Sequence, residues 1–229
     1  MDISQLRDEL VRFSNGRSDV NTFVDYDDYI KWQTLTGMSH ESDNEHWKNG
    51  QVRCVKEIFT NINRNSKILI ASCGDGCCIK TLKELGFTKI TGLEICDSKI
   101  EKATAIWPNI IKTDICSGPL MFENNYDILY SSHTLEHVLN PIFSLKELSS
   151  HLVKNGLIYL ILPYPDFRAG NPQFNHNFKV HCGSIPLGLN IADNGVTTKK
   201  ILTDAGFNVL NCSFQSYREP EIHLTLSVQ

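Results

Sequence analysis

The 229-residue sequence has no apolar run long enough to span a bilayer, because a transmembrane helix needs about 20 consecutive apolar residues. Residues 1–10 alternate charged and apolar side chains and lack the uninterrupted apolar core of a signal peptide. We therefore expect a protein that stays where it is made, in the cytoplasm, with no membrane partner.

The CxxC motif is also absent, since no two of the eight cysteines have that spacing, and the cysteines are spread through predicted strands and helices. This distribution favours reduced thiols over the disulfide framework of a short secreted chain. Cys73, Cys77 and Cys78 lie close together, but their spacing matches no zinc motif and no second ligand pair accompanies them. We expect small buried side chains here and no metal site.

The sequence has no cluster of Lys and Arg. It carries 22 Lys and Arg against 26 Asp and Glu, for a net charge of −4 and a pI near 6.1. Nucleic-acid binding draws on clustered cations, so a general nucleic-acid binder is excluded, although a local basic groove stays open. The 41% of apolar and 21% of charged residues are typical of a folded globular chain.

What the sequence does contain is a helical N-terminal part followed by one large α/β unit. Residues 1–62 predict helices over 4–13 and 27–35, and a third helix capped by Ser42 or Asp43. The third helix carries an apolar stripe made of Trp47, Val52, Val55, Ile58 and Phe59. We expect residues 1–62 to form an extension that covers one side of a ligand cleft.

From residue 63 onward, strands and helices alternate. Strands are expected near 67–71, 88–95, 109–112, 126–131, 156–162, 207–214 and 222–228, with helices over 77–85, 97–106, 142–152 and 197–205. This alternation predicts a Rossmann-like, seven-stranded, mostly parallel α/β sheet with helices on both faces and an antiparallel C-terminal hairpin. Residues 163–196, rich in Pro, Gly, Asn and His, interrupt the pattern and suggest a functional insertion on the substrate side.

The first strand breaks into a glycine turn before a helix, an arrangement that places polar parts of nucleotide-like ligands at a helix N-terminus. Gly74-x-Gly76 begins a dinucleotide motif, but Ile79 occupies the third glycine position. No Tyr-x-x-x-Lys pair follows the fourth strand. An NAD-dependent oxidoreductase is therefore disfavoured.

The ordered motifs of residues 66–228 resemble the class I S-adenosylmethionine-dependent methyltransferases, in their small-molecule, type 11-like branch. Residues 68–76 resemble the glycine-rich first motif, 92–95 the acidic second-strand motif and 112–115 the adenine-contacting segment. Residues 126–138 and 152–158 resemble the fourth- and fifth-strand blocks. The resemblance implies that residues 63–229 form a methyltransferase domain.

The same resemblance implies a site for S-adenosylmethionine in which Glu94 accepts hydrogen bonds from the ribose and Asp114 meets the adenine. The implied cofactor-binding residues are Ser72, Cys73, Gly74, Asp75, Gly76, Glu94, Ile95, Asp114, Ile115 and His133. Two residues depart from the family pattern: Ile70 replaces an acidic residue and Ser72 replaces the first glycine. Serine is compatible with the turn if its φ is negative. Glu94 as a solvated loop residue and Asp114 as a turn cap remain alternatives.

Methyl transfer to a hydroxyl needs a base, and histidine is the side chain best suited to that role near neutral pH. The candidates are His133, just past the fourth strand, and His176 and His181 in the insertion. Asp166 with His176 and His181 could alternatively hold a divalent metal, although their spacing matches no ligand motif.

We expect transfer of a methyl group to a hydroxyl or amine of a small polar acceptor, such as a sugar or another glycan. A homodimer is compatible with the sequence. The alternative from another class is a methyltransferase fold that no longer catalyses and serves as a binding or scaffold subunit.

Overall fold

The structure is a computed structural model that describes residues 44–123, 125–135, 138, 141–163, 195–218 and 220–228. The helices expected over 4–13 and 27–35 and most of the expected insertion, residues 164–194, lie outside these ranges. The division into an extension over 1–62 and a domain over 63–229 therefore stays a prediction.

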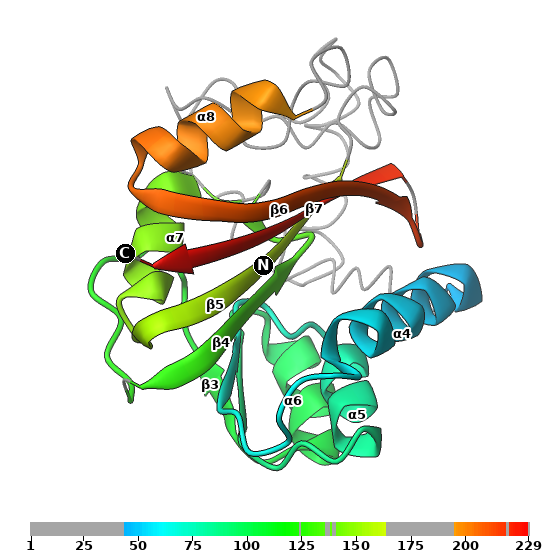
Figure 1. Ribbon diagram of the computed structural model, residues 1–229. Helices are drawn as coiled ribbons and strands as arrows, with labels where there is room; N and C mark the ends of the chain where they lie inside the picture. The colour runs from blue at the N-terminus through cyan, green and yellow to red at the C-terminus, as the bar shows by residue number, and fades with distance from the viewer. Residues whose placement is uncertain are drawn as a thin grey trace, which may run out of the picture.

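A seven-stranded sheet forms the centre of the molecule, with the strand order β3-β2-β1-β4-β5-β7-β6 (Figure 1). The strands are β1 (Ile68–Ile70), β2 (Ile90–Glu94), β3 (Ile110–Lys112), β4 (Tyr126–Ser132), β5 (Leu152–Pro163), β6 (Phe207–Ser216) and β7 (Pro220–Val228). Strands β1 to β5 pair in parallel, whereas β7 runs antiparallel to both β5 and β6. The predicted fold class, including the antiparallel C-terminal hairpin, is confirmed.

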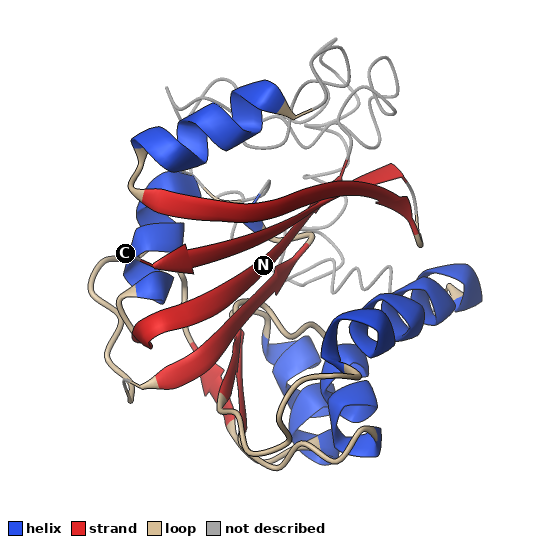
Figure 2. Ribbon diagram, viewed as in Figure 1, coloured by secondary structure: helices blue, strands red, loops and turns tan. Residues whose placement is uncertain are grey.

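Helices cover both faces of this sheet (Figure 2). One face carries α4 (Glu45–Phe59), α5 (Cys77–Glu84) and α6 (Asp97–Ile106), and the other carries α7 (Pro141–Ser149) and α8 (Val196–Asp204). The helix predicted over 97–106 has the same bounds in the structure, and the ends of the other predicted helices after residue 63 differ by at most three residues, as is usual for helix termini. Of the described helices, none is long and apolar enough to cross a membrane.

Helix α4 begins one residue later than expected, so the predicted cap at Ser42 or Asp43 was wrong. Asn44 is the N-cap: it has an extended backbone with φ −121°, and its side-chain oxygen accepts a hydrogen bond from the Trp47 N–H at 3.2 Å. Asn is as good an N-cap as Asp or Ser, because its side-chain oxygen can satisfy an N–H of the first helical turn.

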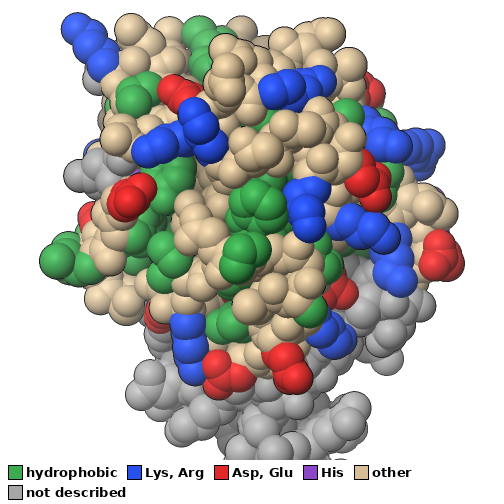
Figure 3. Space-filling model, turned by 90° about the horizontal axis from the view of Figure 1, so that it is seen from below, with side chains coloured by type: hydrophobic (Ala, Val, Ile, Leu, Met, Phe, Trp, Pro, Cys, Tyr) green, Lys and Arg blue, Asp and Glu red, His purple; other side chains and the backbone are tan. Residues whose placement is uncertain are grey.

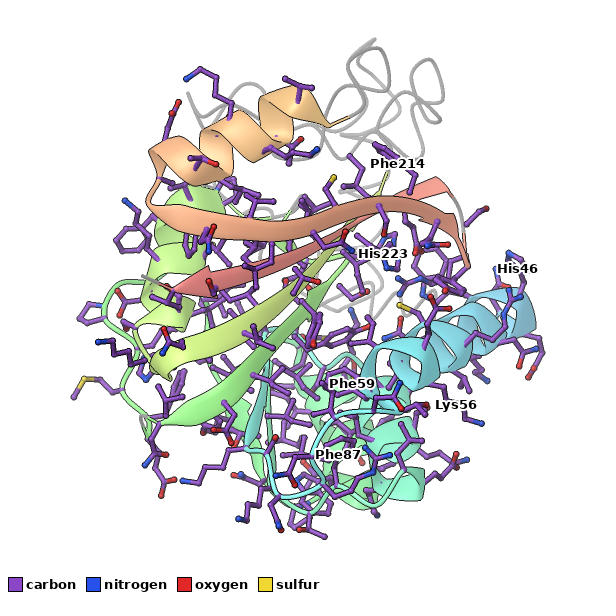
Figure 4. All side chains as sticks on the ribbon, viewed as in Figure 1. His46, Lys56, Phe59, Phe87, Phe214 and His223 are labelled. Carbon is purple, nitrogen blue, oxygen red and sulfur yellow. The ribbon has the colours of Figure 1, made fainter. Side chains whose placement is uncertain are left out.

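Two apolar cores lie on either side of the sheet because successive strand residues point to opposite faces. In β1, Leu69 packs into the core under α7 and α8, whereas Ile68 and Ile70 pack under α4 and α5. On the α4 face Phe59 and Phe87 meet edge to face, with ring centroids 5.7 Å apart (Figure 4). Ile70, which stands where the family usually has an acid, is thus a core residue.

Charged side chains of both signs lie on the surface of the molecule (Figure 3). On the coloured part of the surface in Figure 3, Lys and Arg side chains lie among Asp and Glu side chains.

Helix α4 is held against the corner between β6 and β7, a contact that depends on Gly50. A Cβ atom built at Gly50 would lie 2.4 Å from the backbone oxygen of Tyr217 and 2.6 Å from Cγ of Arg218. The backbone oxygen cannot move aside as a flexible side chain could. The next residue, Gln51, is buried and accepts a hydrogen bond from Nη1 of Arg218.

We predict that Gly50→Ala separates α4 from this corner and lowers the free energy of unfolding by about 1–3 kcal/mol, despite the higher helix propensity of alanine. Urea unfolding followed by circular dichroism measures the change. Asn49→Ala, at an exposed position of the same helix, is the matched control and is expected to stay within about 0.5 kcal/mol of wild type. Equal stability of the two variants would contradict the proposed close contact.

Candidate functional site

The turn after β1 contains three residues with positive φ: Ser72 at 140°, Gly74 at 56° and Gly76 at 92°. Gly76 is the N-cap of α5, and its missing Cβ leaves room for Ile106 of α6, whose Cδ1 would be 2.9 Å away. The negative φ on which the serine was expected to depend is not adopted. Ser72 instead has a conformation that favours glycine, and the strain of such a residue is often found at ligand sites.

The carboxylate of Glu94, at the carboxyl end of β2, lies against this turn. Oε2 accepts hydrogen bonds from the Gly74 N–H at 2.9 Å and from the Ser72 hydroxyl at 3.2 Å. Oε1 accepts from the N–H groups of Ile95 at 2.9 Å and Cys96 at 3.0 Å. Glu94 is buried, so the alternative of a solvated loop residue does not describe its environment.

These four hydrogen bonds decide how a ribose could be bound. An ionised carboxylate offers about four acceptor positions, and each bond from the protein uses one of them. Three of the donors are backbone N–H groups, one from the turn after β1 and two from the segment that follows Glu94 itself. The Ser72 hydroxyl forms the longest bond and can rotate away. The residues therefore fit the cofactor if a ribose hydroxyl replaces the hydroxyl of Ser72 on Oε2.

The other expected cofactor contacts lie at the same edge of the sheet. Thr113 N–H donates to the backbone oxygen of Glu94, which brings the end of β3 beside the end of β2. Asp114 uses Oδ1 to accept from the Cys116 N–H at 2.8 Å, as a turn cap does, and Ile115 is buried in the core. The role of Asp114 in adenine binding stays a prediction.

His133 directly follows β4 at the same edge and has a left-handed backbone with φ 52°. Its N–H donates to the backbone oxygen of Ile161 in β5 at 3.0 Å. Its Nε2 lies 3.1 Å from Oε1 of Glu221, which comes from β7. Three strands therefore define the position of this ring.

Glu221 is at the centre of a buried polar network. Besides His133, its Oε1 accepts from Nε of Arg218 at 2.6 Å, and its Oε2 lies 2.8 Å from Nε2 of His223. Burial alone would raise the pKa of Glu221, but the hydrogen bonds from His133 and His223 and the charge of Arg218 hold it well below its usual range. Glu221 is therefore ionised at neutral pH.

The N-terminal half of α4 closes this network on one side. The Trp47 ring meets the His133 ring edge to face, with centroids 5.0 Å apart, and Arg218 lies over Trp47 at 5.4 Å. His46 Nε2 is hydrogen bonded to the backbone oxygen of Arg218 at 2.9 Å. Figure 4 shows His46 on α4 and His223 on β7 on either side of this corner.

Arg218, Glu221 and His223 were not singled out from the sequence. The signal was present in residues 221–227, where polar and apolar residues alternate and a Glu and a His share one face of the strand. Glu221 lies on a strand between two others, where a buried charge needs a partner of opposite charge. Arg218, three residues before Glu221, is such a partner.

Two of the three candidate bases, His176 and His181, lie outside the described residues, as does Asp166 of the metal hypothesis. In the part of the chain that the structure describes, no three His, Cys, Asp or Glu side chains are grouped to hold a metal ion. Cys73 and Cys78 are buried in the core beneath α5, as expected for small packing residues.

A parallel sheet whose first turn is rich in glycine and faces an acid at the end of the second strand defines a nucleotide-binding α/β protein. The family model for the methyltransferase domain matches residues 45–211. The chain belongs to this family, and the resemblance to the class I methyltransferases is confirmed. No curated protein matches the chain.

Solved structures share the fold at low identity. The N-methyltransferase NodS from Bradyrhizobium japonicum WM9, in complex with S-adenosyl-L-homocysteine, gives a TM-score of 0.59 with 14% identity over 97% of this chain and 98% of that chain. Magnesium protoporphyrin IX methyltransferase from Synechocystis PCC 6803, with S-adenosylhomocysteine bound, gives 0.56 with 15% identity over the whole of both chains. The [4+2]-cyclase SpnF gives a TM-score of 0.57 with 14% identity over 77% of this chain and 80% of that chain. With the family assignment, these structures support S-adenosylmethionine as the cofactor that the fold takes.

We predict that Ser72→Gly is more stable than Ser72→Ala by about 1 kcal/mol. Glycine removes the strain of the positive φ, and this gain exceeds the extra chain entropy that glycine loses on folding. Both variants lose the hydroxyl, so their difference isolates the backbone. Urea unfolding of the pair measures it, and equal free energies of unfolding would show that Ser72 is unstrained.

The lowered pKa of Glu221 predicts a pH-dependent contribution to stability. The contribution is fully present above the ordinary value of 4.5 and is lost as the pH falls below it toward the lower pKa of the folded state. Glu221→Gln is expected to cost about 3 kcal/mol at neutral pH, because Arg218 loses its buried partner charge. Urea unfolding between about pH 3 and pH 7 should show the gap to wild type shrinking with acid. A difference in the free energy of unfolding that does not change with pH would contradict the predicted contribution of Glu221.

Proposed function

We propose that the chain is an S-adenosylmethionine-dependent methyltransferase that methylates a hydroxyl or amine of a small polar acceptor, with sugars and other glycans as the first class to test. The observation that carries the proposal is the hydrogen bond from Gly74 to Glu94, which joins the glycine turn to the acid that would hold the ribose. His133, at the adjoining strand end, supplies a base.

The bound cofactor would supply an electrophilic methyl group on sulfur. The protein's own residues then have to hold the two partners in line and take one proton, and such positioning can account for a large share of the rate. The backbone of Cys73 to Gly76 and the carboxylate of Glu94 would hold the nucleoside, with Asp114 and Ile115 beside the adenine. His133 would take the proton from the acceptor.

The acceptor class is inferred from the polar side chains at this edge of the sheet and from the balanced charge of the chain. His176 and His181 stay as further candidates for the base. A cytoplasmic location and a homodimer are part of the proposal as expectations.

A second candidate is a methyltransferase fold without methyl transfer, and one observation favours it. The carboxylate of Glu94 is already bound by four donors of the protein, and Ile70 occupies the position of a family acid. The [4+2]-cyclase with the same fold is an example in which this architecture has another activity.

Isothermal titration with S-adenosylmethionine and S-adenosylhomocysteine tests the proposal. We predict that wild type binds both and that Glu94→Gln weakens S-adenosylhomocysteine about 30-fold, the equivalent of about 2 kcal/mol for a charge-assisted hydrogen bond. The amide of glutamine would turn one acceptor oxygen into a donor that faces backbone N–H groups.

Asp97→Asn is the matched control, because Asp97 is an exposed carboxylate three residues away that pairs only weakly with exposed Lys112. Its affinity for S-adenosylhomocysteine is expected to equal that of wild type. Absence of binding by wild type at about 1 mM of either ligand would reject the methyltransferase. Binding without release of S-adenosylhomocysteine on a panel of hexoses, amino sugars and small amines would favour the second candidate.

Addition of Mg²⁺ or EDTA to the same assay tests the metal hypothesis. Indifference to both would reject it.

A further inference from the structure

Three donors converge on the carboxylate of Glu221, and their chemistry fixes the protonation of both histidines. Arg218 can only donate, and an ionised carboxylate can only accept. The nitrogens of His133 and His223 that face Glu221 are therefore the N–H nitrogens. In the neutral imidazole, a proton on Nε2 leaves Nδ1 as the basic nitrogen.

We propose that Glu221 is a positioning residue that holds His133 as the Nε2–H tautomer, so that Nδ1 of His133 takes the proton of the acceptor. The inference deepens the proposed function and rests on it. In the step, a lone pair of the acceptor oxygen or nitrogen forms the bond to the methyl carbon while the carbon–sulfur bonding pair passes to sulfur. The acceptor proton moves to Nδ1, and the sulfonium becomes the neutral thioether.

The charge of Glu221 gives this arrangement its energetic advantage. Protonated His133 carries a positive charge, and an ionised carboxylate 3.1 Å from Nε2 stabilises it at a site where water is largely excluded. The same partner fixes the ring orientation, as a buried acid does for the histidine of a catalytic triad.

The other groups around the network leave this balance undisturbed at neutral pH. Arg218 compensates the charge of Glu221, and the two are buried side by side. Burial raises the pKa of the Cys54 thiol on α4 to about 12 and the pKa of Tyr130 on β4 well above its usual value, so both stay neutral. Neither group therefore adds a charge beside Glu221 and His133 at neutral pH.

Stability alone is a poor reason for such a network in this place. A buried ion pair carries a desolvation cost that apolar residues of similar volume would avoid. On the opposite face of the same strand, Ile222, Leu224 and Leu226 pack into the apolar core. The polar residues are confined to the face that turns toward α4 and His133.

The direct test is the tautomer of His133 in the full chain. Long-range proton–nitrogen correlation spectra of the ¹⁵N-histidine-labelled protein, with and without S-adenosylhomocysteine, report which ring nitrogen carries the proton. His133→Gln and His223→Gln assign the signals. We expect the Nε2–H tautomer at both histidines when the imidazoles are neutral, and an Nδ1–H tautomer at His133 would overturn the inference.

Glu221→Gln tests the charge in the same spectra. It is expected to lower the pKa of His133 by about 1 unit or more, because the neighbouring anion is lost while Arg218 remains. Leu224→Ala, which removes apolar volume from the opposite face of β7, is the control for loss of stability and should leave that pKa unchanged. A pKa of His133 that is equal in wild type and Glu221→Gln would also overturn the inference.

Turnover supplies the third readout. On an acceptor of the panel that wild type methylates, Glu221→Gln should lower kcat about 100-fold with little change in KM, and Glu221→Asp should recover part of the loss. Unchanged kcat in Glu221→Gln would overturn the positioning role.

Titration with S-adenosylhomocysteine separates this inference from the proposed function. A wild type that fails to bind it refutes the methyltransferase even if His133 has the expected tautomer. Binding together with an Nδ1–H tautomer refutes the role of Glu221 alone.

Discussion

The arrangement of the candidate site depends on one buried carboxylate. Glu94 joins the end of β2 to the turn after β1 by accepting from Gly74 and Ser72 on one oxygen and from two N–H groups of its own segment on the other. Without this acid, the N–H of Gly74 in the turn and those of Ile95 and Cys96 would lose their hydrogen-bond acceptor, which is costly for groups that are partly or fully buried. The strained backbone of Ser72 is held from both sides, because the N–H of Ala71 donates to the backbone oxygen of Tyr130 and the N–H of Cys73 donates to that of Leu93.

A second buried carboxylate organises the opposite part of the same edge in a different way. Glu94 is surrounded by backbone and hydroxyl donors, whereas Glu221 is bound by a guanidinium and two imidazoles. Neutral, fixed donors suit an acid that holds a neutral ligand. Imidazole donors suit an acid whose partner is proposed to gain and lose a proton. Helix α4 joins the two regions, since its first turns contact Arg218 while its later residues pack on β1.

The order of the strands and helices could be predicted because it depends on local periodicity and on the spacing of Gly and Pro. Helix α6 was predicted with its observed bounds, and the C-terminal hairpin followed from two strands too close for a crossover. Glu94 and His133 could be proposed because each comes directly after a predicted strand. Arg218, Glu221 and His223 pair with one another within a few residues, but their place in the site could not be predicted because their other partners lie far away in sequence. Gln51 is 167 residues from Arg218, and His133 is 88 from Glu221. The conformation of Ser72 was likewise out of reach, since the residues on either side of it are bonded to β4 and β2.

The pairing of β7 has a consequence for how this part of the chain can change in evolution. In the observed register His223 lies opposite Ile161, and Glu221 opposite Pro163, at the carboxyl end of β5. Side chains alternate between the faces of a strand, so one residue inserted into or deleted from the connection between β6 and β7 would send Glu221 and His223 into the apolar core or shift the whole strand. Length variation in this turn should therefore occur in relatives only together with loss of the polar network. The turn is constrained in its length more strictly than in its composition.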